Sequence, residues 1–136
     1  MKILLTGANG YIGKRLLPQL VQSGHEVWCC VREPQRFQVT ESLRPHVHVL
    51  QVDFLNPGDV KFPEGMDAGY FLIHSMTGSK GGFQKLEEET ATQFVRLANQ
   101  ASVKQIVYLG GLANSDVLSE HLKSRVAVEE VLKKAY

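Results

Sequence analysis

Cysteine is scarce in this 136-residue chain, and its two examples, Cys29 and Cys30, are adjacent. Neighbouring side chains of a strand point to opposite faces, so we do not expect these thiols to form a disulfide with each other. Neither has the spacing to other cysteines or histidines that zinc sites use, and we predict no metal site. We interpret both as small apolar core residues of a cytoplasmic protein in a reducing compartment.

Long runs of one residue class are also missing. The formal net charge is +1, and the longest block of like charge is the three acids at 87–89, which is typical of a solvated helix face. A chain with this charge balance has no excess of positive charge of the kind that nucleic-acid-binding proteins use. No apolar run approaches the roughly 20 residues that span a bilayer, and no secretory signal follows Met1. We therefore expect neither nucleic acid nor a membrane as a partner.

What the chain does have is an alternation of two hydrophobic patterns. Short apolar segments predict buried strands, and longer segments with apolar residues three or four positions apart predict amphipathic helices. The predicted strands are 2–5, 27–31, 47–52, 68–74 and 105–109, and the predicted helices are 11–23, 83–101 and 118–135. Residues 56–67 contain two prolines and two glycines, which favours an irregular connection.

Strands that alternate with helices predict an α/β fold with a parallel sheet. Right-handed crossovers favour the doubly wound Rossmann fold, here with a five-stranded sheet in the order 3-2-1-4-5 and helices on both faces. A chain of 136 residues is long enough for one compact domain and too short for two. We expect residues 1–136 to form one domain of this fold.

The first predicted strand runs directly into a glycine-rich turn that opens the first helix. In such turns one glycine permits the sharp bend, a second leaves room for a pyrophosphate, and a third lets helix and strand pack closely. The helix start then offers unpaired N–H groups to the phosphates. The alternative is a sharp turn without a ligand. The candidate cofactor-binding residues here are Thr6, Gly7, Asn9, Gly10, Tyr11, Ile12 and Gly13.

The residue after the second predicted strand decides between NAD and NADP. An acid at this place binds the ribose 2′-hydroxyl of NAD, whereas an arginine pairs with the 2′-phosphate of NADP. The strand is predicted to end at Val31, so Arg32 occupies the place and NADP is favoured. A shift of one residue would put Glu33 there and favour NAD. Arg36 could assist Arg32 or be solvated.

Four further candidates follow the third and fourth predicted strands. Asp53 either accepts a hydrogen bond from the adenine amino group or initiates a turn, and Phe54 comes next to it. His74 and Ser75 follow the fourth strand, where they would line the adenine ribose. A lone histidine at a strand end is more often a hydrogen-bonded structural residue.

Together these motifs resemble the short-chain dehydrogenase/reductase superfamily, in its extended or atypical branch. Besides the glycine-rich turn, the resemblance is carried by Val31-Arg32, Asp53-Phe54, Ile106-Val107-Tyr108-Leu109 and the helical segment 124–130. Segments 70–76, 108–112 and 121–125 are similar to NmrA-like or epimerase-like NAD(P)H-binding proteins. The resemblance implies a Rossmann domain that binds NADP, or alternatively NAD, within an oxidoreductase or an epimerase-like enzyme.

The chain departs from the superfamily at the catalytic positions. Active members carry a serine after the fifth strand and a Tyr-x-x-x-Lys pair on the next helix, which exchanges a proton with the substrate and anchors the nicotinamide ribose. Here Gly110 or Gly111 takes the serine position, and His121 and Arg125 take the other two. His121 and Arg125 are therefore catalytic candidates for an unknown small-molecule substrate. A non-catalytic NADP-binding redox sensor or scaffold, or a flavin-linked reductase, remains an alternative.

The resemblance also concerns what surrounds this domain. Superfamily members continue with a sixth strand and a substrate-binding region, which we expect to lie beyond residue 136; the alternative is a naturally minimal domain without them. The fifth strand would then be an open edge that invites pairing. Relatives pair through their two long helices, so the resemblance implies a homodimer through 83–101 and 118–135.

Overall fold

The computed structural model describes the backbone of residues 1–73, 83–110 and 120–135, without the side chains of 83–84, 120–124 and 135. The predicted alternation of strands and helices is confirmed, with ends that shift by a few residues. The strands are β1 (Lys2–Thr6), β2 (Glu26–Val31), β3 (Val47–Gln51), β4 (Ala68–Phe71) and β5 (Ile106–Tyr108). The α-helices are α1 (Tyr11–Gln22), α2 (Phe83–Gln100) and α3 (Glu120–Ala135).

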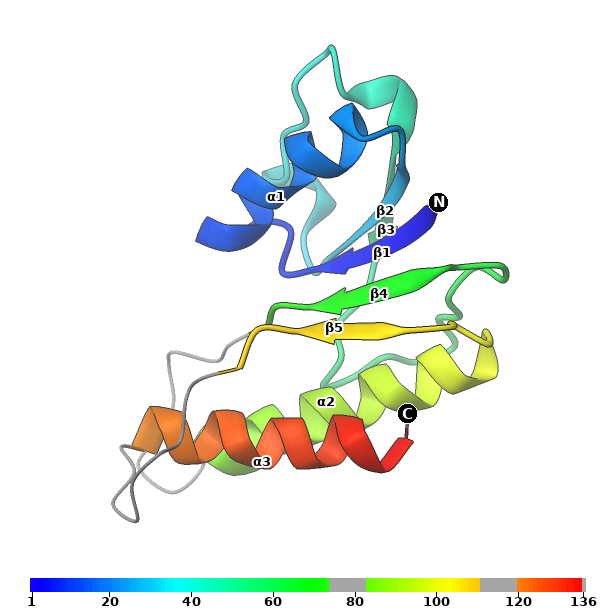
Figure 1. Ribbon diagram of the computed structural model, residues 1–136. Helices are drawn as coiled ribbons and strands as arrows, with labels where there is room; N and C mark the ends of the chain where they lie inside the picture. Colours follow the sequence, from blue (N-terminus) through cyan, green and yellow to red (C-terminus); the bar gives the residue numbers. More distant parts are fainter. Residues whose placement is uncertain (74–82, 111–119, 136) are drawn as a thin grey trace.

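In the part of the chain that the structure describes, one parallel sheet has the strand order β3-β2-β1-β4-β5. Figure 1 shows α1 on one face of the sheet, and α2 and α3 packed against each other on the opposite face. Residues 3–5 of β1 are apolar and buried, as expected for a central strand that is covered on both faces. The predicted doubly wound Rossmann fold is therefore confirmed.

The sheet separates two hydrophobic cores. Leu20 of α1 belongs to one core, and Phe94 of α2 and Val128 of α3 belong to the other. Cys29 and Cys30 lie in different cores, which confirms that they face opposite sides of the sheet. Burial raises the pKa of the Cys29 thiol to about 12 and also raises the pKa of Cys30. Both thiols are therefore protonated core residues.

The connection between β3 and β4 contains no helix in the described structure, as the prolines and glycines of 56–67 predict. It nevertheless supplies large side chains to the core under α2. The ring centroids of Phe54 and Phe94 are 6.0 Å apart in an edge-on contact, and Phe62 lies 5.7 Å from Phe94. These aromatic contacts hold the segment after β3 close to α2.

The three acids at 87–89 do not form the solvated helix face that their charge indicated. Glu87 is only 4% exposed. It shares one side of α2 with Ala91, Phe94 and Ala98, which are all buried, because residues three, four and seven positions apart lie on the same face. The expectation was wrong for Glu87 because helical phase, rather than local charge, decides which side chains meet the sheet.

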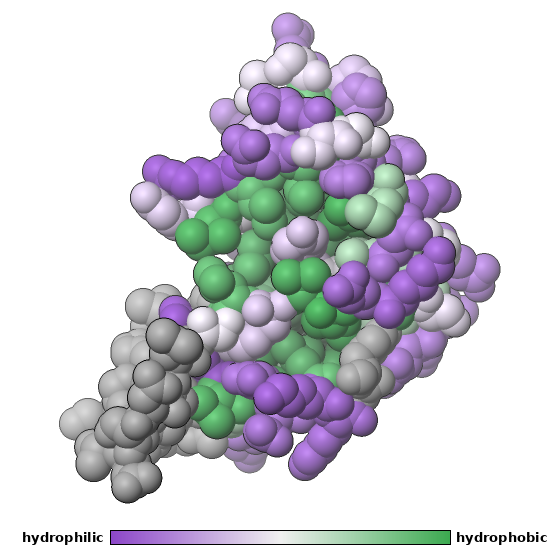
Figure 2. Space-filling view, in the orientation of Figure 1, coloured by the Kyte–Doolittle hydropathy of each residue, from purple (hydrophilic) through white to green (hydrophobic). Residues whose placement is uncertain are grey.

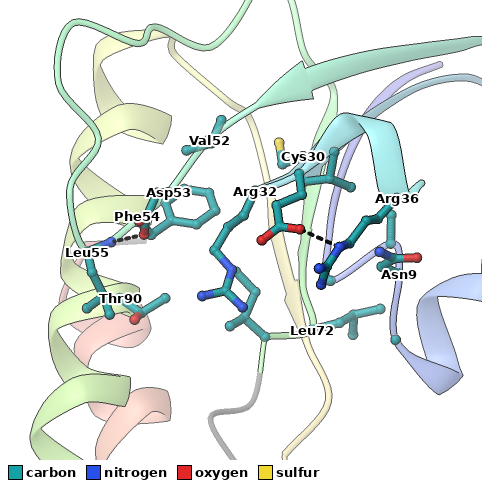
Figure 3. Close-up of a pocket in the computed structure, with 16 residues that line it drawn as sticks. Asn9, Cys30, Arg32, Arg36, Val52, Asp53, Phe54, Leu55, Leu72 and Thr90 are labelled. Carbon is teal, nitrogen blue, oxygen red and sulfur yellow. Dashed lines mark hydrogen bonds and ion pairs between the residues drawn. The ribbon is translucent and has the colours of Figure 1, made fainter.

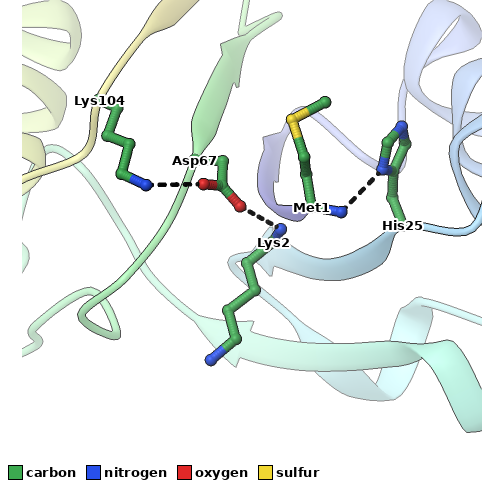
Figure 4. A network of polar contacts seen from close by, with 5 residues as sticks. All are labelled: Met1, Lys2, His25, Asp67 and Lys104. Atoms are coloured by element: carbon green, nitrogen blue, oxygen red, sulfur yellow. Dashed lines mark hydrogen bonds and ion pairs between the residues drawn. The ribbon is translucent and has the colours of Figure 1, made fainter.

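A polar clasp joins the strands at their amino ends, away from the glycine turn (Figure 4). The Asp67 carboxylate accepts the backbone N–H of Lys2 at 2.8 Å and the Lys104 ammonium at 3.0 Å. These two donors, the backbone N–H first, hold the pKa of Asp67 below its ordinary value. The clasp therefore ties the start of β1 to the segments before β4 and β5.

The β5 edge of the sheet is apolar. Ile106, Val107 and Tyr108 are each half-buried, and Leu109 is 50% exposed. In Figure 2 hydrophobic side chains gather across the middle of the view, over the strands, between polar side chains above and below. Among the described helices, every one is too short or too polar to cross a bilayer.

Candidate functional site

A cavity of about 450 Å³ opens at the carboxyl ends of β1 to β4. The helix that follows β1 lies on one face of the sheet and the helix that follows β4 lies on the other, and open α/β sheets bind ligands where successive helices change face in this way. The lining comes from the glycine turn, the ends of β2 and β4, the segment after β3 and Thr90 of α2. Figure 3 shows these side chains around the opening.

The three glycines of the turn have different surroundings. Gly7 has a φ of +65°, and a Cβ there would lie 2.8 Å from the Leu72 carbonyl oxygen. A Cβ on Gly13 would lie 2.2 Å from the Gly7 carbonyl oxygen. A Cβ on Gly10 would meet only that same oxygen, at 3.3 Å, and Gly10 lines the cavity. Gly7 and Gly13 therefore form the turn, while Gly10 keeps the cavity clear.

The start of α1 is left open toward a ligand. Gly10 is the N-cap, no side chain caps the helix, and the first turn holds no acid. The first intrahelical bond joins the Lys14 N–H to the Gly10 carbonyl oxygen at 2.9 Å. The N–H groups of Tyr11, Ile12 and Gly13 thus have no partner among the described residues, and they carry the positive end of the helix dipole. Unpaired amides beside a bare Gly10 fit a phosphate group.

Three predicted contacts in the turn, Thr6, Tyr11 and Ile12, have side chains that do not line the cavity. Thr6 is fully buried, where its hydroxyl donates to the Tyr70 carbonyl oxygen at 2.8 Å and accepts the Leu72 N–H at 3.1 Å. It therefore bridges β1 to β4. Tyr11 is 70% exposed, and the Arg15 guanidinium carbon lies 3.5 Å from the centroid of its ring. Thr6 thus supports the glycine turn from inside the core.

Arg32 directly follows β2, in the register that the sequence predicted. Its exposed side chain lines the cavity, and Figure 3 shows the guanidinium directed into it. The Gln51 side chain donates a hydrogen bond of 3.2 Å to the Arg32 carbonyl oxygen, which fixes the backbone there. Glu33 and Arg36 line the same cavity and form an ion pair, with Arg36 Nε 2.7 Å from Glu33 Oε2.

Asp53 forms the turn that was one of its two predicted roles. Its Oδ1 accepts the Leu55 N–H at 3.0 Å, and its carbonyl oxygen accepts the Asn56 N–H at 3.0 Å. The other carboxylate oxygen makes no hydrogen bond to the described residues. Phe54 also lines the cavity, although its ring is packed in the core.

Several cavity residues were not among the predicted contacts. Leu72 and Ile73 follow β4, and the rule that ligands bind at the carboxyl ends of parallel strands would have found them. Thr90 comes from the middle of α2 and has no local signal, because only tertiary packing brings it opposite β3. Of the predicted contacts, His74 and Ser75 lie outside the described residues.

The catalytic candidates lie on α3. The side chain of His121 is outside the description, and Arg125 is half-buried but does not line the cavity. The Arg125 carbonyl oxygen accepts the Tyr108 hydroxyl at 3.3 Å. Burial, and after it the Glu87 carboxylate, raise the pKa of Tyr108 to about 12, so this hydroxyl is a poor acid near neutral pH. Gly110 after β5 offers no side chain in place of the family serine.

The sequence matches a known protein family. The NAD(P)H-binding family matches residues 7–136, nearly the whole chain. The chain belongs to this NAD(P)H-binding family. The match confirms the cofactor class that the glycine turn indicated, and the open cradle at Gly10 agrees with it.

Known proteins resemble this NAD(P)H-binding domain over different lengths. A segment of 53 residues is 38% identical to an uncharacterized protein of Saccharomyces cerevisiae and covers 39% of the chain and 18% of that protein. A nucleoside-diphosphate-sugar epimerase from Staphylococcus aureus matches 99% of the chain, with 22% identity and a TM-score of 0.74. Triphenylmethane reductase of Citrobacter sp., complexed with NADP(H), matches 98% with 20% identity and a TM-score of 0.73.

At these identities the two solved structures show a shared fold. The chain spans 47% of the epimerase and 45% of the reductase, so it corresponds to less than half the length of either protein. The resemblance to the atypical dehydrogenase/reductase superfamily is confirmed at the level of fold and cofactor class. Three expectations stay predictions: the cytoplasmic location, a sixth strand and substrate-binding region beyond residue 136, and the homodimer through α2 and α3.

Proposed function

We propose that this domain binds NADP(H) in preference to NAD(H) and serves an oxidoreductase or epimerase-like protein. The observation that carries the proposal is the cradle at the start of α1, where Gly10 leaves the cavity clear and the first-turn amides have no described partner. The pyrophosphate would lie on these amides. Their partial positive charge attracts the phosphates, and a backbone without side chains lets them approach closely.

The preference for NADP(H) rests on Arg32. Its guanidinium lines the cavity directly after β2, where dinucleotide-binding folds distinguish a ribose hydroxyl from a ribose phosphate. A guanidinium can bind two oxygens of a phosphate at once. The adenine would then lie near Asp53 and Phe54, with the free oxygen of Asp53 as acceptor for the adenine amino group.

When bound, the nicotinamide cofactor supplies or accepts a hydride. The chain's own candidates for handling a proton or the nicotinamide ribose are His121 and Arg125 on α3. An imidazole has a reference pKa near neutrality and can act as acid or base. A guanidinium stays protonated and can anchor a ribose hydroxyl. His121 would therefore take the role of the family tyrosine, and Arg125 that of the lysine.

The second candidate function is a non-catalytic NADP-binding sensor or scaffold. The observation that favours it is that the described residues at the end of β5 offer no obvious proton donor. Tyr108 is engaged with the Arg125 carbonyl oxygen and has a pKa raised to about 12, and Gly110 has no side chain. Turnover of small carbonyl compounds with NADPH, abolished in His121→Ala, would establish the enzyme. NADPH binding without turnover of any carbonyl compound, in a full-length version that includes the substrate-binding region, would favour the sensor.

The cofactor proposal is tested by titrating the protein with NADPH and NADH. We expect NADPH to bind more tightly, and Arg32→Ala to weaken NADPH by roughly tenfold or more while changing NADH little. Arg44→Ala is the matched control, because Arg44 is an exposed arginine that bonds the Val39 carbonyl oxygen outside this cavity. Equal losses for both nucleotides in Arg32→Ala would overturn the preference for NADP(H).

A further inference from the structure

The turn after β2 forces Glu33 and Arg36 together. Pro34–Arg36 is a 3-10 helix with Glu33 as its N-cap, closed by a 3.0 Å bond from the Arg36 N–H to the Glu33 carbonyl oxygen. Side chains three positions apart are eclipsed in a 3-10 helix. The carboxylate and the guanidinium therefore meet, with Arg36 Nε 2.7 Å from Glu33 Oε2.

This turn is held at both ends. The Phe37 N–H bonds to the Pro34 carbonyl oxygen at 3.1 Å, and the Phe37 side chain packs against the core on the α1 side of the sheet. At the other end, Gln51 holds the Arg32 carbonyl oxygen. The ion pair is exposed, with 77% of the Arg36 side chain and 51% of the Glu33 side chain accessible. Exposed ion pairs add little to stability, so the role of this pair lies in ligand binding at the cavity that both residues line.

The charges at this end of the cavity favour a phosphate only while the Glu33–Arg36 ion pair is formed. Glu33 lies one residue after the position where an acid binds the ribose diol of NAD. With its carboxylate neutralised by Arg36, the positive charge of Arg32 faces the ligand alone. With Arg36 removed, the free carboxylate would repel a 2′-phosphate and accept hydrogen bonds from a 2′-hydroxyl.

We propose that the Glu33–Arg36 ion pair selects the 2′-phosphorylated nucleotide, with Arg36 acting as a positioning residue that occupies the Glu33 carboxylate. This inference rests on the proposed function, because it assigns the same cavity to NADP(H). Arg36 is not required to touch the phosphate. Its contribution is to keep the Glu33 carboxylate from binding the ribose hydroxyls of NAD(H).

A double-mutant cycle on the full chain tests this role, with the dissociation constants of NADPH and NADH as readouts. In Arg36→Ala we expect NADPH to bind about tenfold more weakly and NADH to bind severalfold more tightly. Glu33→Gln should leave NADPH binding nearly unchanged. Adding Arg36→Ala to Glu33→Gln should then cost NADPH little, because the acid that Arg36 restrains is gone. Arg44→Ala, which removes an equal charge elsewhere, should change neither nucleotide.

Two results would overturn the inference. The first is an equal loss of NADPH affinity on Arg36→Ala with and without Glu33→Gln, which would mean that Arg36 contacts the phosphate itself. The second is unchanged NADH affinity in Arg36→Ala. Either result leaves the proposed function intact if the unaltered protein prefers NADPH. Failure of the unaltered protein to bind either nucleotide would instead refute both proposals.

Discussion

A Cβ atom added to Gly13 would lie 2.2 Å from the carbonyl oxygen of Gly7. The start of α1 is thus packed against the end of β1 more closely than any side chain permits. This contact fixes the angle at which the helix leaves the strand. It thereby determines where the unpaired N–H groups of the first turn point, and the binding proposal depends on that direction.

Replacement of Gly13 should therefore damage the fold. We expect Gly13→Ala to lower the free energy of unfolding by about 3 kcal/mol or more, because backbone atoms on both sides of the contact must move. The measurement is urea unfolding followed by circular dichroism. Gly24→Ala is the control, since a Cβ there meets nothing within 4 Å and only the φ of +88° opposes it. That strain should cost about 1 kcal/mol. Equal losses in the two variants would contradict the close contact.

The buried hydroxyl of Thr6 should also matter for stability. Thr6→Val keeps the shape of the side chain but leaves the Tyr70 carbonyl oxygen and the Leu72 N–H without their partner. We expect the free energy of unfolding to fall by about 2 kcal/mol. Thr6→Ser retains the hydroxyl and should lose less. If thermal or urea unfolding ranks Ser below Val, the bridge between β1 and β4 has little energetic weight.

The Asp67 clasp should make stability depend on pH in the acid range. Its pKa is lowered in the folded state, so the ionised form stabilises the fold at pH values above the ordinary pKa of 3.8. This contribution is lost as the pH falls through the folded-state pKa. Asp67→Asn should accordingly be less stable than the unaltered protein at neutral pH, and the difference should shrink as the solution is acidified.

The comparison for this variant is Asp59→Asn, at an exposed acid that makes no described hydrogen bond or ion pair. We expect the free energy of unfolding of Asp59→Asn to differ from that of the unaltered protein by the same amount at every pH. Urea unfolding across the acid range measures both. A constant deficit for Asp67→Asn down to the most acidic conditions would show that its carboxylate does not act through its charge.

The order of the sheet was predictable because it follows from two general constraints. Apolar runs locate the strands, and right-handed crossovers arrange them. The burial of Glu87 does not follow from the run of charge at 87–89, although its spacing from Phe94 on one helix face carries the signal. The 3-10 turns at Pro34–Arg36 and Arg44–His46 were also missed, since such short elements leave no periodicity to read.

The candidate site was predictable where a single segment builds it. The glycine turn and Arg32 were found because their spacing from β1 and β2 is local information. The place of Thr90 in the cavity lining was not predictable, because it depends on how α2 meets the segment after β3. Thr6 shows a further limit: its place in the motif suggested a cofactor contact, whereas its burial gives the hydroxyl to β4.

The most direct test of the account is a calorimetric titration of NADPH into the unaltered protein and into Gly10→Val. A Cβ at Gly10 needs an adjustment of only a few tenths of an ångström against the Gly7 carbonyl oxygen, so the variant should fold. Its side chain would fill the cradle. We predict saturable binding by the unaltered protein and a loss of roughly a hundredfold or more in Gly10→Val. Equal binding by the two folded proteins, or no binding by either, would contradict the claim that this turn holds the pyrophosphate.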